Sequence, residues 1–413
     1  MKKLLVIGHI WPEPTTTAAG NRMIQLLEAF LAHDYTIIFA STASKTQFSY
    51  DLKGMDIEEV PIQLNDSSFD DFVKELKLDA VLFDRFMVEE QFGWRVAENC
   101  PEVVRILNTE DLHSLREYRR TCFTNNLRFL QSEYLREDKT KREFASIFRS
   151  DLTLLVSSFE RGLLENSIGI PSDLLLHLPF MLPEITHDEM IYWPSFDDRS
   201  DFISYGNGHH APNIDSFQQL KHAIWPLIRK ALPNARLHIY GAYLPQSIKQ
   251  LHAPKNGFLV HGWAQNLNEL VRRAKVVLAP LNFGAGIKGK LTTAMQCGTP
   301  NITTEIGKEG MAEPLPWSGA IGTNAEELAN SAIQLYQDRE KWEQLQKNGI
   351  TIINSVFNTV VLQEKLLKRM EHIINNLDTY RSKNIVGSLL HHQTMASTKY
   401  MGKWIEEKNK SRK

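Results

Sequence analysis

The sequence predicts an α/β protein with two doubly wound parallel sheets, and two observations carry this prediction. The chain has 413 residues, which is too long for one ordinary core and fits two domains of roughly 200 residues each. Short apolar runs rich in β-branched residues recur along it, separated by stretches with helical spacing, as in strands joined by crossover helices. An apolar fraction of 42% is that of a chain that folds.

The first unit is expected in residues 1–190. The apolar run after Met1 is similar to a signal peptide, but it stops at Pro12 before a full apolar segment is complete, so we interpret it as the first strand. The helix expected after this strand has the clearest helical spacing, because apolar residues from Met23 to Leu31 fall on one face. The expected strands are Leu4–Ile10, Tyr35–Ala40, Ala80–Phe83, Val103–Leu107 and Leu152–Val156.

The second unit is expected in residues 195–355, after a polar link that begins at Trp193. Its expected strands are Phe202–Tyr205, Arg236–Tyr240, Phe258–Val260, Val276–Leu281 and Asn301–Thr304. Residues 356–413 are expected to form helices and a basic tail, which we interpret as a solvated segment and not as a binding element. Ligands of doubly wound sheets bind beyond the carboxyl ends of the strands, so the cleft between the units is the expected site.

The composition excludes several classes of protein. Lys and Arg number 47 against 49 Asp and Glu, a formal net charge of −2, so no overall field attracts nucleic acid and no nucleic-acid partner is expected. The three cysteines, Cys100, Cys122 and Cys297, are widely spaced, which argues against a disulfide framework and a zinc site and for a reducing, cytoplasmic compartment. The sequence contains no run of about 18 apolar residues, so we expect no transmembrane helix.

The densest signal for chemistry runs from a strand into a helix. It contains three glycines and two lysines, namely Gly284, Gly286, Lys288, Gly289 and Lys290. Glycines let the backbone approach a ligand, a helix amino end offers free N–H groups, and lysines add charge, so the segment suits a diphosphate. It is neither a Walker A loop nor a dinucleotide fingerprint. The alternative is a tight turn with surface lysines.

Residues 279–310 resemble the nucleotide-sugar-binding half of the glycosyltransferase group 1 family, of the family 4 type. The shared residues read Phe-Gly-Ala-Gly-x-Lys-Gly-Lys, then Ala-Met, Gly-Thr-Pro and Thr-Thr-x-Ile-Gly-x-Glu-Gly, ending at Gly310. Further segments that resemble the family lie at 205–215, 224–228, 237–241 and 108–116. The resemblance implies the GT-B architecture, in which two Rossmann-like domains face each other, followed here by a C-terminal helical segment.

The resemblance also implies an activity. Members of the family transfer a sugar from a nucleoside diphosphate, so we expect a hexosyltransferase-type enzyme with a nucleotide-sugar donor and an acceptor that the sequence does not identify. The nucleotide sugar is a substrate, and neither a cofactor nor a metal ion is expected, since the sequence has no Asp-x-Asp tripeptide. Retention at the anomeric carbon is usual in the family and is expected here.

The family pattern assigns donor binding to Gly20, Asn207, Gly284, Gly286, Lys288, Lys290 and Thr293. Many members carry a Glu-x7-Glu pair where this chain has Ala285 and Thr293, and a threonine offers the ribose one hydroxyl in place of two carboxylate oxygens. Asn207 falls where an arginine is usual, which leaves more of the phosphate charge to the two lysines. Gly20 lies in a loop of small residues, for which a plain connection is the alternative.

Asp111 and His113 are the candidate catalytic residues. They follow the strand Val103–Leu107 at its carboxyl end, where an α/β sheet presents its reactive groups. A histidine there can hydrogen-bond a sugar hydroxyl, and an aspartate can accept a proton. The alternative is that Asp111 caps the following helix and His113 packs beneath it.

Residues 116–149 are basic and aromatic with interleaved acids, so pairing on a solvated helix face is the favoured interpretation. The alternative is an acceptor surface for an anionic glycan, a lipid phosphate or a membrane, which leaves a peripheral contact with the inner membrane face open.

Two other functions also stay open. One is a nucleotide-sugar epimerase on the same architecture. The other is a non-catalytic glycan-binding or partner-binding module, which Ala285 and Thr293 suggest.

Overall fold

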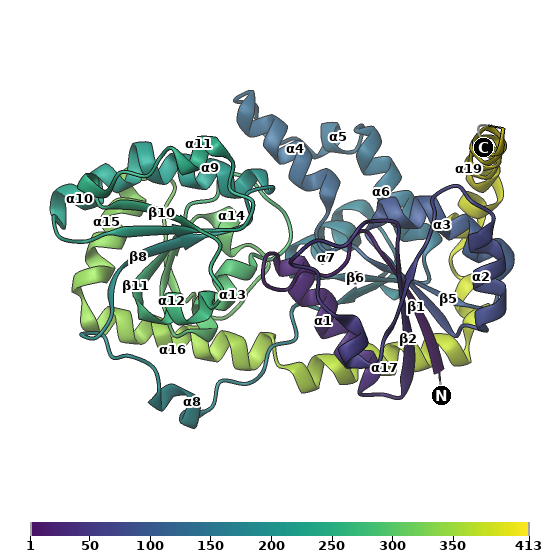
Figure 1. Cartoon of the computed structure of the whole chain (residues 1–413), viewed down its shortest axis with the longest axis horizontal. Coiled ribbons are helices and arrows are strands. Elements are labelled where there is room, and N and C mark those ends of the chain that lie inside the picture. The colour runs from purple at the N-terminus through teal and green to yellow at the C-terminus, as the bar shows by residue number, and fades with distance from the viewer. Residues whose placement is uncertain (1, 412–413) are drawn as a thin grey trace.

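Two α/β domains lie side by side in the computed structural model, which describes residues 2–411 apart from the side chains of residues 393–396 (Figure 1). The first domain contains the amino-terminal strand, and the chain then crosses to the second domain through a link that contains α8 (His187–Ile191). Both domains are built on a parallel sheet with crossover helices.

The first sheet has seven parallel strands in the order β3-β2-β1-β4-β5-β6-β7. All residues of β4 and β5 are buried, as expected for inner strands of a sheet covered on both faces. The strands are β1 (Lys2–Gly8), β2 (Tyr35–Ser41), β3 (Glu58–Pro61), β4 (Ala80–Asp84), β5 (Val104–Asn108), β6 (Leu152–Leu155) and β7 (Leu175–His177). The helices are α1 (Ala18–Leu31), α2 (Ser68–Leu76), α3 (Phe86–Asn99), α4 (His113–Thr124), α5 (Gln131–Tyr134), α6 (Asp138–Arg149) and α7 (Ser158–Gly162).

The second sheet has six parallel strands in the order β10-β9-β8-β11-β12-β13. They are β8 (Ser200–Tyr205), β9 (Leu237–Tyr240), β10 (Phe258–Gly262), β11 (Ala274–Ala279), β12 (Asn301–Thr303) and β13 (Gly319–Ile321). The helices are α9 (Ala211–Gln219), α10 (Trp225–Ala231), α11 (Gln246–Lys249), α12 (Leu267–Arg273), α13 (Gly289–Gln296), α14 (Glu305–Lys308), α15 (Ala325–Gln337) and α16 (Arg339–Val356). Short 3-10 or π-helical turns lie at Leu52–Met55, Leu163–Ile168, Ser172–Leu174, Leu220–Ile224 and Pro254–Asn256.

All ten predicted strands are present, and the prediction of two doubly wound α/β units is confirmed. The strands β3, β7 and β13 were not predicted. They have only three or four residues each, too few to show a period of their own.

The C-terminal helices return to the first domain. They are α17 (Thr359–Asn375), α18 (Leu377–Ser382) and α19 (Ile385–Lys410). On α17, Leu366, Met370 and Ile373 belong to the hydrophobic core of the first domain, and α19 packs against α3 and α6. The basic stretch expected as a solvated tail is part of α19.

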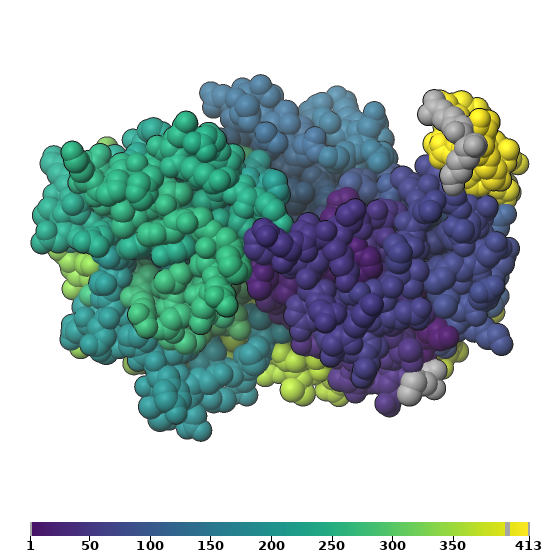
Figure 2. All heavy atoms as spheres, viewed as in Figure 1, coloured from purple at the N-terminus to yellow at the C-terminus, as the bar shows by residue number. Residues whose placement is uncertain are grey.

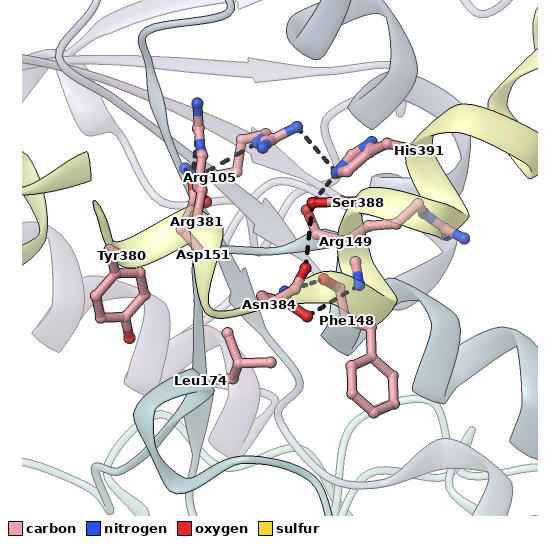
Figure 3. Close-up of a pocket in the computed structure, with 11 residues that line it drawn as sticks. Arg105, Phe148, Arg149, Asp151, Leu174, Tyr380, Arg381, Asn384, Ser388 and His391 are labelled. Carbon is pink, nitrogen blue, oxygen red and sulfur yellow. Dashed lines mark hydrogen bonds and ion pairs between the residues drawn. The ribbon is translucent and has the colours of Figure 1, made fainter. Parts of the chain in front are cut away.

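A cluster of charged side chains holds these helices against the first sheet (Figure 3). Asp151, directly before β6, accepts from Arg381 Nε at 2.8 Å and from Arg381 Nη2 at 2.7 Å. Arg105 Nη1 lies 3.0 Å from His391 Nε2 on α19. Burial opposes the ionisation of Asp151, but the hydrogen bonds from Arg381 and the charge of Arg105 outweigh it and hold the pKa of Asp151 below its usual range.

Replacing Arg381 tests this cluster. Arg381→Ala leaves Asp151 buried with one cation fewer, so we expect the free energy of unfolding to fall by about 2–3 kcal/mol and amide exchange to become faster in α17–α19. Denaturant titration and hydrogen exchange measure both. The control is Arg136→Ala, which breaks an exposed pair with Glu133 and should change the free energy by about 0.5 kcal/mol or less. Equal effects of the two substitutions would contradict an anchoring role for Arg381.

Candidate functional site

Loops that follow the carboxyl ends of strands in the two sheets meet between the domains. The loop after β1 contacts the loop after β8, where Asn207 Nδ2 donates to the Thr16 backbone oxygen at 3.3 Å. The first turns of α1 and α13 are also close, because a Cβ on Gly289 would lie 2.5 Å from Ala18 Cβ. Figure 2 shows the two domains in contact. The candidate residues of both domains therefore share one interface.

The glycine-rich loop between β11 and α13 is hydrogen-bonded to the first domain. The Gly286 N–H donates to Glu160 Oε1 at 2.7 Å, and the same oxygen accepts from the Leu112 N–H at 3.1 Å. Gly286 has a φ of +63°, and a Cβ there would lie 2.8 Å from Asp111 Cβ. Both the backbone conformation and the close approach therefore require glycine.

Lys288 is buried beside this loop, and Lys290 is half-buried. Lys288 Nζ donates to the Gly286 carbonyl at 2.7 Å, and Lys290 Nζ donates to Asn213 Oδ1 at 2.8 Å. Burial lowers the pKa of Lys288 to about 8, against the opposing charge of Glu309, and burial lowers the pKa of Lys290 to about 7. Two such ammonium groups bonded only to neutral oxygens gain free energy when an anion arrives.

Two further predicted donor residues lie in the same segment. The Gly284 carbonyl, at the start of the loop, accepts from Arg119 Nη1 at 2.9 Å. Thr293 lies on α13 beside the buried hydroxyl of Tyr205, which donates to the Lys290 carbonyl at 2.6 Å. The predicted residues from Gly284 to Thr293 are thus brought together.

Gly20 and Asn207 lie on the facing loops. A Cβ on Gly20 would lie 2.5 Å from the Glu13 backbone, so the loop after β1 closes over α1 only because residue 20 is glycine. Thr17 caps α1 by accepting from the Gly20 N–H at 2.9 Å. Glu13, which the sequence analysis did not single out, reaches the second domain, since the Tyr243 hydroxyl donates to its Oε2 at 3.2 Å.

Asp111 and His113 lie just past β5, where they were predicted. Asp111 Oδ1 is 3.3 Å from His113 Nε2, and Arg116 Nη1 donates to Asp111 Oδ2. Burial opposes the ionisation of Asp111, but Arg116 outweighs it and lowers the pKa of Asp111 to about 2. Burial lowers the pKa of His113 to about 3, so the imidazole is neutral at neutral pH. Glu143 takes the capping role considered for Asp111, because it accepts from the N–H groups of His113 and Ser114 at 2.9 Å.

Besides Glu13, four further side chains of this interface were not predicted as site residues. Arg119 on α4 makes a two-point ion pair with Glu309, with N–O distances of 2.7 and 2.9 Å. Glu160 receives the Gly286 N–H. His210, exposed to the cleft, has a pKa lowered first by desolvation and then by the charge of Arg116. Glu309 belongs to the quoted family motif, but its partner lies 190 residues away in the chain.

The basic stretch 116–149 forms α4, α5 and α6, and most of its cations are paired with acids of the first domain. The pairs include Arg136–Glu133, Lys139–Glu117, Lys141–Asp138, Arg142–Glu90 and Arg149–Glu89. These contacts fit the pairing interpretation.

A cavity of about 530 Å³ opens between α4 and α9. The first domain contributes Arg120 and Phe123, and the second contributes His209, Asp215 and Phe283. The rings of Phe123 and Phe283 lie 5.6 Å apart between centroids. Its volume lies in the range of small-molecule sites.

Two further facts concern only residues that the structure describes. Among them, no three His, Cys, Asp or Glu side chains lie close enough together to hold a metal ion. Within residues 2–411, no helix combines the length and the hydropathy that crossing a membrane requires.

The sequence and the structure were compared with those of known proteins. Residues 200–338 match the family described as Glycosyl transferases group 1. Sequence comparison with curated proteins gives no significant match. The structure is similar to sucrose-phosphate synthase from Thermosynechococcus elongatus (TM-score 0.68, 15% identity, 91% of this chain and 100% of that chain) and to a glycosyltransferase from Rickettsia africae (0.64, 12%, 91% and 99%). It is also similar to HepE from Anabaena in complex with UDP (0.66, 13%, 90% and 100%).

The chain has the GT-B fold, and the enzyme class that its fold and sequence define is that of the glycosyltransferases. More particularly, residues 200–338, which make up most of its second domain, match the group 1 glycosyltransferases. The fold predicted from the sequence is confirmed, and this match supports the predicted family and enzyme class.

The buried Glu160 predicts a pH dependence. Burial, followed by the charge of Asp111, raises its pKa from 4.5 to about 8, so its contribution to stability is full below about pH 4.5 and is lost progressively as the pH rises to about 8. The free energy of unfolding should therefore fall between pH 6.5 and pH 8, by at most about 1.4 kcal/mol per pH unit from this group. Glu160→Gln keeps the acceptor oxygen without the titration and should flatten this slope in denaturant titrations.

The control for Glu160 is Glu75→Gln, which changes an exposed carboxyl on α2 and should leave the slope as in the unmodified protein. Identical slopes for the unmodified protein and Glu160→Gln would contradict a protonated Glu160.

Proposed function

We propose that the protein transfers a sugar from a nucleoside diphosphate sugar to an acceptor hydroxyl, with the donor diphosphate at the start of α13. The observation that carries the proposal is the pair of lysines beside the glycine-rich loop, the buried Lys288 and the half-buried Lys290. The first N–H groups of a helix and two ammonium groups attract the same anion. The structures of HepE with UDP and with UDP-glucose support a nucleotide-sugar donor.

In the proposed reaction the bond between the anomeric carbon and the phosphate oxygen breaks, and the acceptor oxygen bonds to the anomeric carbon. The proton of the acceptor hydroxyl passes to the departing phosphate oxygen. Negative charge grows on the departing diphosphate, where Lys288, Lys290 and the amino end of α13 stabilise it. These groups can perform this task without a metal ion, so we propose a metal-independent reaction with no cofactor beyond the substrate. Retention at the anomeric carbon is proposed from the family resemblance.

Asp111 and His113 are the proposed catalytic residues. The close approach of Gly286 to Asp111 supports this assignment, because a sugar attached to a diphosphate at α13 would meet this pair. The ionised Asp111 favours positive charge developing at the anomeric carbon, and the neutral His113 can hydrogen-bond a sugar hydroxyl.

We propose that the acceptor enters through the cavity between α4 and α9, where the exposed ring of Phe123 offers an apolar face to a sugar ring. We also propose a cytoplasmic location with peripheral contact at the inner membrane face. The free thiols of Cys100, Cys122 and Cys297 support a reducing compartment.

A panel of sugar nucleotides tests the reaction. With UDP-, GDP- and ADP-sugars, of which UDP-glucose is the first choice, we expect slow release of the nucleoside diphosphate even without an acceptor, detected by chromatography. A changed sugar with an intact diphosphate would identify an epimerase instead. Donor or glycan binding without any turnover would identify a non-catalytic module, as Ala285 and Thr293 suggest.

The lysines are tested separately. Lys288→Ala and Lys290→Ala each remove a charge-assisted contact of roughly 1.5–3 kcal/mol, so each should weaken nucleoside diphosphate binding by about tenfold or more in calorimetry. The control is Lys255→Ala, an exposed lysine before β10 at the other edge of the second sheet.

The same titrations have a pH dependence. Because the free protein loses the Lys290 proton near pH 7 and the Lys288 proton near pH 8, affinity for UDP-glucose should fall as the pH rises from 7 to 9. Lys290→Ala should reduce this fall. Full affinity in both lysine variants would contradict the placement of the diphosphate.

A further inference from the structure

Helix α19 carries an apolar face that nothing in the described part of the chain covers. Six of its large apolar side chains are exposed, namely Ile385 (65%), Val386 (42%), Leu389 (58%), Tyr400 (68%), Met401 (59%) and Trp404 (59%). They form two groups, one at residues 385–389 and one at residues 400–404. Single exposed apolar residues are normal on a protein surface, but two such groups on one helix mark a contact site.

The spacing of these residues defines one face. At about 100° per residue, Ile385, Leu389, Tyr400 and Trp404 fall within an arc of about 100°. The opposite side packs against the first domain, where Gly402 lies against Trp94 and the Glu406 carboxylate pairs with Arg95. The helix is therefore held by one face while its apolar face points to solvent.

The charges on α19 are mainly positive. The helix contains four lysines, of which Lys399 pairs with Glu98, Lys410 pairs with Glu407, and Lys403 and Lys408 make no such pair among the described residues, against two glutamates. One of these, Glu406, is buried in its pair with Arg95. Lys408 Nζ lies 5.0 Å from the centre of the Trp404 ring. An apolar face with tyrosine and tryptophan, bordered by lysines, has the composition of a helix that lies in a membrane interface.

We propose that α19 binds the surface of an anionic lipid bilayer, with its apolar face in the headgroup region and its lysines against lipid phosphates. The assignment rests on the proposed peripheral membrane contact and not on the proposed sugar transfer. It also places that contact on α19 and not on residues 116–149, whose cations are largely paired within the protein.

A bilayer fits this face better than a second copy of the chain. A two-fold contact between α19 helices would bring their lysines toward one another, which is unfavourable, whereas anionic headgroups neutralise them. Tyr400 and Trp404 each combine an apolar ring with a polar group, which suits a boundary between hydrocarbon and water.

The helix is fixed well enough to orient the protein on a membrane. Its start is held where Asn384 Nδ2 donates to the Phe148 carbonyl at 2.7 Å and Asn384 Oδ1 accepts from the Gly387 N–H at 2.9 Å (Figure 3). Farther along, Arg95 pairs with Glu406. Lipid binding by α19 therefore holds the whole first domain at the bilayer.

Vesicle sedimentation with the full chain tests the proposal. We expect binding to phosphatidylcholine vesicles containing about 30% phosphatidylglycerol, and much weaker binding to phosphatidylcholine alone. The double substitution Leu389→Ser with Trp404→Ser should lower the partition coefficient by about tenfold or more, because two apolar side chains leave the interface. Lys403→Glu should weaken binding to the anionic vesicles only.

The control is Tyr192→Ser, which removes an even more exposed aromatic ring, 81% exposed, from the link between the domains and should leave vesicle binding unchanged. UDP-glucose titration of every variant separates this proposal from the proposed function, since donor binding should be the same in all of them. Unaltered vesicle binding in the double variant, or no binding to anionic vesicles, would overturn the proposal. So would self-association in sedimentation velocity that the double substitution abolishes, because it would identify a second copy as the occupant.

Discussion

The Gly286 N–H donates to Glu160 Oε1 across the domain boundary, and the arrangement of the cleft depends on this bond. The same oxygen accepts from the Leu112 N–H, so one carboxyl positions both the glycine-rich loop and the turn that carries Asp111. The contact requires a residue with a positive φ and no Cβ at position 286. It holds the loop suited to phosphate beside the residues proposed to act on the sugar.

Ionisable groups of both signs are buried around this contact, and their surroundings decide which of them carry charge. Asp111 stays ionised because Arg116 is bonded to it, whereas burial favours the protonated form of Glu160. The lysines 288 and 290 are less strongly charged than usual because burial penalises the ammonium form. Such a site is suited to an anion, because a bound diphosphate would supply a negative charge close to the two lysines and favour their ammonium forms.

The C-terminal helices are anchored at the edge of the first sheet opposite to the edge that carries the candidate site. Arg105 and Asp151, which anchor α18 and α19, lie at the amino ends of β5 and β6. Asp111 and Glu160 lie beyond the carboxyl ends of the same two strands. A contact made through α19 therefore need not cover the cleft.

The sequence by itself determined the fold class, ten of the strands and the glycine-rich loop, because apolar runs, helical spacing and closely spaced glycines are local patterns. Only the tertiary structure decided how these parts are partnered. It pairs Arg119 with Glu309 and Gly286 with Glu160, residues more than 100 positions apart, and it gives Gly20 a packing role. It also decided that one face of α19 is exposed. A helical period shows which residues share a face, but whether that face is covered depends on neighbours that are distant in the chain.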